Sequence, residues 1–311
     1  MAAILVIKLS ALGDLIQADG ALRDIRENHP DDRLVVMTTP PYRRYMERCP
    51  WVDEVFIDPR ASRFNVLQMV KLCKRLYLND FDCVYDLQQV GRTRFYQRWL
   101  FPPGRWVGDA PGCSVYLKRD EERTCAADHF ADLLRSAGLD VRYTRRTDVS
   151  WMADDVKQVL SESAIRPGFI VLIPGASRAH EHKRWPYFKE LARRLQEMGK
   201  EVVTIPGPDE MKLCRTIPGK MLVPAYGYYD IFKLAGIIKQ ASFVIGNDTG
   251  PTHLAAHLGL PGIALFGEHT ASVSTGIQHT GFTVMEFGSL DELPVSGVLQ
   301  QVEVLLAGTV G

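Results

Sequence analysis

The sequence predicts an α/β fold made of two doubly wound parallel sheets. Short apolar segments, several rich in Val and Ile, alternate with segments of helical periodicity along most of the chain. The alternation occurs in two series of similar length, and a polar stretch separates them. A chain of 311 residues, 46% of them hydrophobic, also exceeds the usual size of one domain. We therefore expect two domains, each a parallel sheet with helices on both faces.

The first series predicts strands at residues 4–7, 34–37, 54–57 and 83–86. It predicts helices at residues 15–25, 42–48, 65–78 and 129–136. Between residues 92 and 120 the periodicity weakens, because Pro102-Pro103-Gly104 and Pro111-Gly112 interrupt it. We expect a long, partly irregular surface segment there.

The second series begins after a junction that we expect between residues 138 and 168, where buried periodicity is lost. Strands are predicted at residues 169–173, 201–205, 221–223, 242–245 and 261–266, and helices at 186–198, 209–216, 229–239 and 295–306. We place the two Rossmann-like domains at residues 1–155 and 156–311. The closing helix could pack back on the first domain.

Composition excludes some classes of function. The 37 basic and 37 acidic residues balance, so no overall field favours nucleic acid or an anionic membrane. Six scattered cysteines lack the close pairs of zinc or redox motifs, which predicts reduced thiols. The N-terminal apolar run is too short for a signal peptide, and no later run reaches membrane-spanning length. We expect a cytoplasmic protein and leave peripheral membrane contact open.

One stretch, residues 246–256, is expected to form a tight turn and the start of a helix between two buried strands. Asp248 stands at the expected N-cap, and Gly250 allows a ligand close to the backbone. Pro251 is tolerated in the first turn, where no intrahelical N–H bond is lost. Such a helix start suits a phosphate or a sugar hydroxyl. Alternatively, Asp248 and Thr249 only cap the helix and His253 packs.

The loops after the other strands are the next candidates, because ligands of such sheets bind beyond the carboxyl ends of the strands. The loop from Ser10 to Asp14 lacks the glycine spacing of nicotinamide enzymes and of P-loop ATPases. Asp14 could be a carboxylate base or an ordinary first-turn acid. Small residues near Ser177, with Lys183 ahead of a helix, could hold a phosphate or form a solvated loop. Glu210 could accept ribose hydroxyls or be a first-turn acid.

Several ordered motifs resemble glycosyltransferase family 9, the ADP-heptose:lipopolysaccharide heptosyltransferases. They span almost the whole chain: Lys8 with Ser10-x-x-Gly13-Asp14, then Lys183-x-Trp185-Pro186, then Asp248-Thr249-Gly250-Pro251-x-His253-Leu254-Ala255-Ala256, and finally Leu265-Phe266-Gly267. The resemblance implies a GT-B fold, in which two Rossmann-like domains face a central cleft. It also implies that the first domain binds the acceptor and the second binds the nucleotide sugar.

The resemblance further implies an inverting transfer of heptose from ADP-heptose to a hydroxyl of the lipopolysaccharide inner core. Asp14 would be the general base, and Lys183 would act on the diphosphate. The other residues assigned to the donor are Ser10, Gly13, Ser177, Glu210, Asp248, Thr249, Gly250 and His253. No cofactor or metal is expected, because a lysine and two helix N-termini can stabilise the departing diphosphate. The ADP sugar is a substrate.

The expected acceptor is an anionic glycolipid, or a protein in place of it. Basic residues gather in the first half of the chain: Arg60, Arg63, Lys71, Lys74, Arg92, Arg94, Arg98, Arg105, Lys118 and Arg119. Four aromatic residues, Phe95, Tyr96, Trp99 and Phe101, could face sugar or lipid, or lie in the core. The alternative functions are a protein-directed heptosyltransferase and a GT-B sugar-nucleotide epimerase. Contact with the inner membrane is a further open expectation.

Overall fold

The computed structural model describes residues 1–100, 104–118, 120, 125–176, 178–268, 275–278 and 281–308. The chain divides into two compact units, Met1–Thr147 and Asp148–Gly311. The sequence predicts a junction after residue 155, within a window of residues 138–168. In the structure it falls between Thr147 and Asp148.

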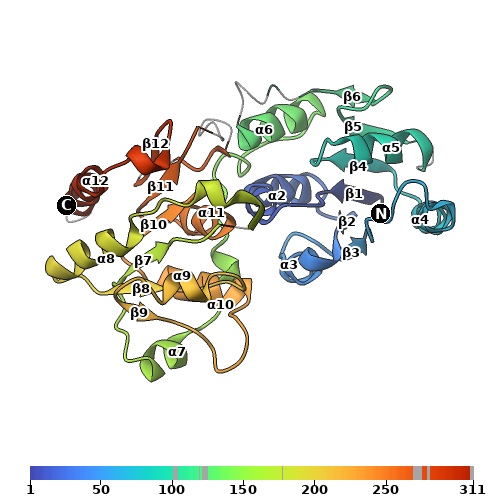
Figure 1. The fold of residues 1–311 in the computed structure, drawn as a ribbon. Coiled ribbons are helices and arrows are strands. Elements are labelled where there is room, and N and C mark those ends of the chain that lie inside the picture. The colour runs from blue at the N-terminus through green and yellow to red at the C-terminus, as the bar shows by residue number, and fades with distance from the viewer. Residues whose placement is uncertain are drawn as a thin grey trace. The chain divides into compact units, whose positions relative to one another are not determined.

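The N-terminal unit is one parallel sheet with helices connecting its strands (Figure 1). Its strands are β1 (Ala3–Ile7), β2 (Arg33–Thr38), β3 (Glu54–Ile57), β4 (Cys83–Asp86), β5 (Arg105–Gly108) and β6 (Val115–Tyr116). Its helical segments are α1 (Leu12–Gln17), α2 (Asp19–Asn28), η1 (Pro40–Tyr42), α3 (Arg43–Arg48), α4 (Val66–Asn79), α5 (Gly91–Trp99) and α6 (Ala126–Ser136). The strand order is β3-β2-β1-β4-β5-β6.

The C-terminal unit repeats this plan. Its strands are β7 (Ile170–Ile173), β8 (Val202–Thr204), β9 (Lys220–Met221), β10 (Phe243–Asn247), β11 (Gly262–Phe266) and β12 (Phe282–Glu286). Its helical segments are η2 (Ser150–Met152), α7 (Lys157–Glu162), η3 (Arg178–Lys183), α8 (Phe188–Glu197), α9 (Met211–Cys214), α10 (Ile231–Lys239), α11 (Gly250–His257), η5 (Leu290–Glu292) and α12 (Val295–Gly308). The strand order is β12-β11-β10-β7-β8-β9.

Both sheets have the strand order of a Rossmann fold. Numbered within each unit, the order is 3-2-1-4-5-6, and every described pairing is parallel. The order reverses between β1 and β4 in one unit and between β7 and β10 in the other. Ligands of such sheets bind at this switch point, outside the carboxyl ends of the strands. The fold therefore directs attention to the loops after these four strands.

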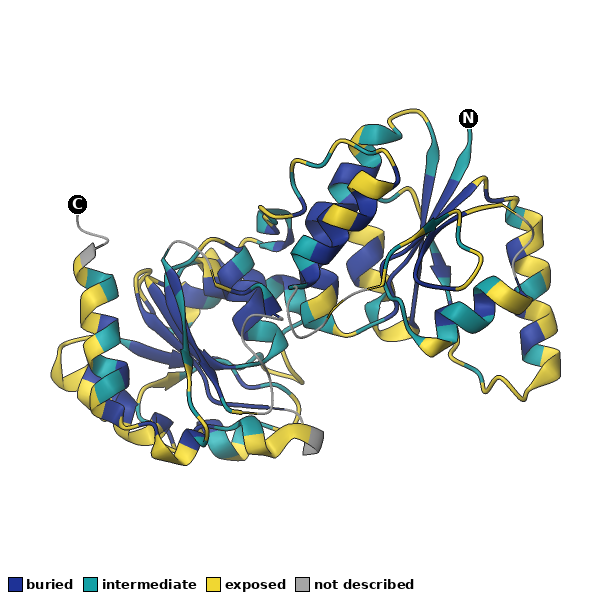
Figure 2. Cartoon of the chain, turned by 90° about the horizontal axis from the view of Figure 1, so that it is seen from above, coloured by how far each residue is buried: buried dark blue, intermediate teal, exposed yellow. Residues whose placement is uncertain are grey.

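The strands form because they can be buried on both faces. Figure 2 shows the strands of both sheets mostly in the buried colour. In β1, the four residues from Ile4 to Ile7 are at most 2% exposed, and Phe243, Val244 and Ile245 of β10 are fully buried. Parallel sheets covered by helices select such continuous apolar segments. The amphipathic helices supply the rest of each core, for example Leu191 and Leu195 of α8.

The segment at residues 92–120, expected to be partly irregular, also holds regular elements that the sequence did not predict. It contains α5, β5 and β6. Helix α5 was missed because it has only a short apolar face: Thr93 and Tyr96 are its buried residues, and both carry polar groups. Strand β12 was also missed, because its residues are mostly half-buried and lack a continuous apolar run.

The closing helix α12 packs within its own unit. Its residues Val295, Val298 and Val302 belong to the same apolar cluster as Ile170 of β7 and Ile263 of β11. All six cysteines are free thiols, as the sequence predicts. Among the described residues, no helix combines the length and the apolar character needed to cross a bilayer.

Candidate active site

The candidate donor site lies at the switch point of the C-terminal sheet. The β7 and β10 registers pair Ile173 with Gly246, so Asn247 and Asp248 extend level with the loop that follows β7. That loop begins at Pro174 and Gly175. The loop after β8 brings Glu210 to the same edge, because its carboxylate lies against Gly175. Segments far apart in sequence therefore meet at one edge of one sheet.

Each carboxylate oxygen of Asp248 contacts a basic side chain. Lys183 Nζ lies 2.5 Å from Oδ2, and His253 Nε2 lies 3.2 Å from Oδ1. Burial of Asp248 would raise its pKa, but the hydrogen bonds and charges of His253 and Lys183 lower that pKa to about 2. Asp248 is therefore ionised at neutral pH and can accept hydrogen bonds but cannot donate a proton. The lowered pKa therefore favours a role in binding over a role as general acid.

Lys183 is placed by the tryptophan that follows two residues later. The Trp185 side chain is buried and donates from Nε1 to the backbone oxygen of Leu293 at 3.0 Å. Its backbone N–H donates to Asn247 Oδ1 at 3.0 Å. Lys183 keeps 23% of its side chain exposed beside Asp248, which is 8% exposed. The lysine is therefore anchored by its neighbours and still open to a ligand.

Asn247 is the residue that ties these segments together, and sequence reasoning missed it. Its side chain is fully buried at the end of β10. Besides accepting from Trp185, it donates from Nδ2 to the backbone oxygens of Pro174 at 2.9 Å and Gly175 at 3.2 Å. A polar residue ending a buried strand, directly before Asp248, was the available signal.

Helix α11 starts one residue later than expected. Thr249, not Asp248, is its N-cap, and the Thr249 side chain makes no capping bond. The Thr249 backbone oxygen instead accepts from the N–H groups of Thr252 and His253. The N-cap prediction for Asp248 is wrong because Asp248 precedes the N-cap residue; its carboxylate instead binds Lys183 and His253. Gly250 is the first residue of α11.

Glu210 is the N-cap residue of α9, and its side chain turns back over two glycines. Its Oε2 accepts from the Gly207 N–H at 2.8 Å. A Cβ on Gly175 would lie 1.6 Å from its Oε1, so the carboxylate occupies the space that a side chain would fill. Glu210 thus stands beside the β7 loop. Ser177, the remaining predicted donor residue of this unit, lies outside the described residues.

The predicted base, Asp14, lies at the matching edge of the N-terminal sheet. It is exposed in the first turn of α1, and its Oδ2 accepts the Ala11 N–H at 2.9 Å. Nearby, burial raises the pKa of Tyr42, and the charge of Asp14 adds to the effect. This geometry allows both roles considered for Asp14, since a first-turn acid can still reach solvent. Ser10 and Gly13 belong to this unit as well.

The loop from Lys8 to Ser10 is held by the loop after β4. Gln88 Oε1 accepts from the N–H groups of Leu9 at 2.8 Å and Ser10 at 3.2 Å. The buried Lys8 donates to the Leu87 backbone oxygen at 3.3 Å and lies over the Phe130 ring. The two switch-point loops of this unit are therefore bound to each other.

Two of the predicted acceptor arginines are engaged in internal ion pairs. Arg92 binds the fully buried Asp58 through Nε and a terminal nitrogen, both at 2.9 Å. Arg94 pairs with Asp109, whose side chain is 3% exposed. Tyr96 is fully buried and donates to Asp58 at 2.7 Å, so the core alternative is right for this aromatic residue. Arg119 and Phe101 lie outside the described residues.

Asp86 is a buried acid at the end of β4. Its Oδ1 accepts the N–H groups of Gln88 and Gln89. Its Oδ2 has no hydrogen-bond partner in the part of the chain that the structure describes. Burial raises the pKa of Asp86 to about 6, although the hydrogen bonds of Thr93, Gln89 and Gln88 act to lower it. Within the same described part, no three His, Cys, Asp or Glu side chains gather as metal ligands would.

Two Rossmann-like units, each with polar side chains at its switch point, define the GT-B class of α/β proteins. The family model for glycosyltransferase family 9 (heptosyltransferase) matches residues 117–286, more than half of the chain. The protein therefore belongs to glycosyltransferase family 9 and is a glycosyltransferase. The resemblance seen in the sequence motifs is confirmed.

Curated and solved proteins agree with this assignment. Lipopolysaccharide heptosyltransferase 1 of Campylobacter coli is 24% identical over 297 residues, covering 85% of this chain and 83% of that protein. A family 9 glycosyltransferase of Veillonella parvula has a TM-score of 0.84 at 21% identity, with coverage of 99% and 98%. Escherichia coli heptosyltransferase WaaC, solved with ADP-2-deoxy-2-fluoro heptose, has a TM-score of 0.75 at 18% identity, with coverage of 97% and 99%.

Proposed function

We propose that this protein transfers a heptose from ADP-heptose to a hydroxyl of the lipopolysaccharide inner core, with inversion at the anomeric carbon. The observation that carries the proposal is the pair of Lys183 and Asp248 at the switch point of the C-terminal sheet. Support comes from the family and from relatives named as lipopolysaccharide heptosyltransferases. The solved relative with an ADP-heptose analogue supports the donor.

Donor binding is assigned to groups that suit each part of an ADP sugar. Lys183 and the N-terminus of α11, which begins at Gly250, attract the diphosphate. Asp248 remains an acceptor at neutral pH, so it suits the sugar hydroxyls. Glu210 is the candidate for the ribose hydroxyls, beside Gly175. Three further residues of the C-terminal unit are assigned to donor binding: Thr249, His253 and Ser177. Ser10 and Gly13 of the N-terminal unit are also assigned to the donor.

The proposed reaction is a single displacement. Asp14 takes the proton of the acceptor hydroxyl as its oxygen attacks the anomeric carbon of the heptose. The bond between that carbon and the diphosphate oxygen breaks on the opposite face, so the configuration inverts. ADP leaves with the bonding electrons, and Lys183 and the α11 N-terminus stabilise its negative charge. The charge supplied by these groups is the reason for proposing a reaction without a metal or other cofactor.

The test is a transfer assay with ADP-heptose and an inner-core acceptor that lacks heptose. We expect transfer by the protein, and we expect Asp14→Asn to lower kcat by about 10²- to 10⁴-fold at unchanged ADP affinity. ADP-heptose should raise the melting temperature, whereas UDP and GDP sugars should not. Undiminished transfer by a folded Asp14→Asn protein contradicts the base assignment. Stabilisation by UDP sugars alone contradicts the donor.

The same assay separates the two alternatives. A sugar-nucleotide epimerase converts its nucleotide sugar without any acceptor, so product formation in the absence of acceptor would support it. A protein-directed enzyme would label a polypeptide and leave the lipopolysaccharide core unmodified. Retained transfer in excess chelator is expected for the metal-independent reaction.

A further inference from the structure

Helix α4 exposes apolar side chains on the side that faces away from its sheet. Leu67 is 65% exposed, Val70 57%, Tyr77 53% and Leu78 74%. Phe64, just before the helix, is 91% exposed. Figure 2 shows this helix with a largely exposed outer side. The residues Leu67, Val70, Lys71, Lys74, Tyr77 and Leu78 are called the α4 face below.

The inner side of α4 already has its apolar partners. Met69, Leu72 and Leu76 are buried and belong to the core cluster of the N-terminal sheet. These residues recur three and four positions apart, so they occupy one stripe of the helix, and the α4 face occupies the opposite stripe. A helix of a soluble protein normally presents polar residues there. The apolar outer stripe therefore calls for a separate explanation.

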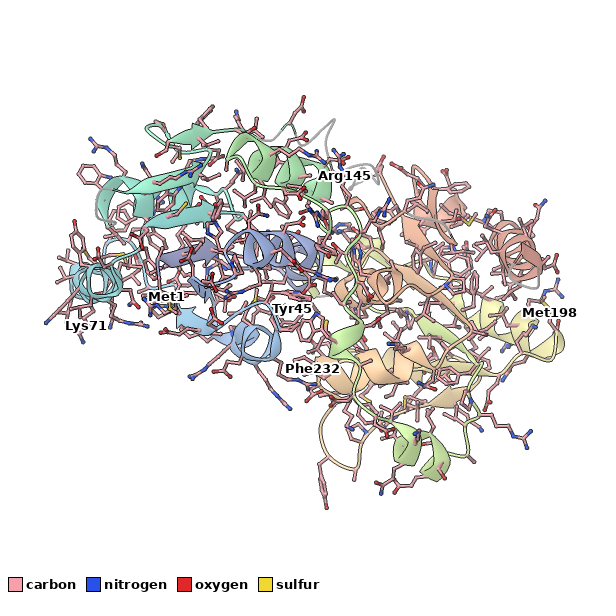
Figure 3. All side chains as sticks on the ribbon, turned by 180° about the vertical axis from the view of Figure 1, so that it is seen from behind. Met1, Tyr45, Lys71, Arg145, Met198 and Phe232 are labelled. Carbon is pink, nitrogen blue, oxygen red and sulfur yellow. The ribbon has the colours of Figure 1, made fainter. Side chains whose placement is uncertain are left out.

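The charges on the α4 face have one sign. The helix contains no Asp or Glu among its 14 residues, while Lys71 and Lys74 are exposed on the outer stripe. Figure 3 labels Lys71 on the outer side of the helix. The whole chain carries equal numbers of acidic and basic residues, so this is a local enrichment. The upstream connection adds Arg60 and Arg63, which are also exposed.

We propose that the α4 face docks on the surface of an anionic lipid bilayer. The apolar side chains of the α4 face would enter the boundary between headgroups and acyl chains, and its lysines would extend to the anionic headgroups. Helix α5 adds an anchor: Cys73 Sγ donates to the Leu100 backbone oxygen at 3.3 Å, and the adjacent Trp99 is 66% exposed. Tryptophan is favoured at the interface of membrane and water.

A second copy of the chain fits this surface less well. A twofold interface centred on the α4 face would bring each lysine pair against its own copy, and like charges oppose such contacts. An anionic bilayer offers acyl chains to the apolar residues and negative headgroups to the lysines. Charge complementarity therefore favours lipid over self-association.

The position of the α4 face deepens the proposed function, on which this step rests. Helix α4 begins after the loop that leaves the carboxyl end of β3, and Arg92 binds that loop through the Ala61 backbone oxygen at 3.0 Å. The carboxyl edge of the same sheet carries Asp14. A docked bilayer would thus lie at the helix whose start adjoins the edge proposed for the glycolipid acceptor.

The test is flotation of the full chain with vesicles of phosphatidylglycerol and phosphatidylethanolamine, without acceptor. We expect binding that falls with salt and is absent with phosphatidylcholine alone. Lys71→Glu/Lys74→Glu should lower partitioning by at least about tenfold. Leu67→Gln/Leu78→Gln should lower it at every salt concentration. The matched controls, Lys189→Glu/Arg193→Glu on α8 and Tyr226→Gln/Val304→Gln at other exposed positions, should bind as wild type.

Absence of wild-type binding to the anionic vesicles overturns the inference, as does unchanged binding by both α4 variants. A wild-type dimer that Leu67→Gln/Leu78→Gln dissociates, with vesicle binding unchanged, also overturns it. A transfer assay with an acceptor freed of its acyl chains needs no membrane, so it tests the proposed function separately from the membrane surface. Wild-type protein that transfers but does not float refutes the membrane surface alone, whereas protein that floats but does not transfer refutes the proposed function alone.

Discussion

Lys183 shows how one side chain can be held in place and remain available. Its charge meets the buried Asp248, and its exposed fraction leaves room for a ligand oxygen. We predict that Lys183→Met lowers kcat/KM by about 10²- to 10³-fold, because one preorganised positive group is lost from the departing diphosphate. Steady-state kinetics with ADP-heptose measure this. Arg184→Met is the control, since Arg184 donates to the Ala176 backbone oxygen and has no proposed contact with the donor.

The buried Asp86 is predicted to lower the stability of the fold as the pH rises, whereas most carboxylates have the opposite effect. Its pKa is raised from 3.8 to about 6, so the folded state binds more protons than the unfolded state between these values. Stability is therefore lost as the pH rises through this range. Asp86→Asn should stabilise the protein at pH 7 by up to roughly 3 kcal/mol, and by much less near pH 4. Urea unfolding at the two pH values decides this, and an equal effect at both contradicts it.

Much of the candidate site was predictable at the scale of residues, and the reason is chemical. Asp248, Lys183 and Glu210 were singled out because charged residues in loops after buried strands are unusual; the structure brings them to one edge, and their roles stay predictions. Asn247 was not found, since its partners Trp185 and Pro174 lie 62 and 73 positions away. Hydrogen bonds of that separation leave no local pattern.

At the scale of elements, the Asn247 side chain connects three segments of the C-terminal unit. We predict that Asn247→Ala destabilises the protein by about 2–4 kcal/mol, because the Trp185 N–H and two carbonyl groups lose a buried partner. The control is Asn65→Ala, which removes only the exposed cap of α4 and should cost about 1 kcal/mol. Chemical unfolding monitored by fluorescence compares them. An Asn247→Ala effect no larger than the control would contradict the connecting role.

The sequence predicts those elements best whose core contacts are purely apolar. Strands β3 and β4 have the predicted bounds, and α4 is displaced by one residue at each end. Prediction failed for α5, where Arg92, Arg94 and Tyr96 look like surface residues but bind buried acids. It failed for β12 because half-buried strands keep too few apolar residues. An element whose buried polar side chains bind residues far away in the sequence therefore cannot be recognised from its local sequence.

At the scale of the whole molecule, donor binding is predicted to protect mainly the C-terminal unit. In the full chain, ADP should slow amide exchange at residues 175–176, 207–210 and 247–253, where the proposed donor residues lie. Residues 8–14 of the other unit should gain less protection with ADP alone, because only Ser10 and Gly13 there are assigned to the donor, and Asp14 is assigned to the acceptor. Hydrogen exchange followed by mass spectrometry resolves these segments. Protection confined to residues 8–14 would contradict the assignment of the donor to the C-terminal unit.

The backbone on both sides of the junction at Thr147 and Asp148 is held by hydrogen bonds. Asp24 of α2 accepts the backbone N–H groups of Arg142, Tyr143 and Thr144, and Thr147 Oγ1 donates to the Gln17 backbone oxygen. The chain is fastened again at Val149, whose N–H donates to the His257 backbone oxygen at 3.1 Å. Each set of bonds lies within one unit, so very few residues between them are unfastened. Proteases cut most readily where several residues are unfastened, so we expect this junction to resist limited digestion.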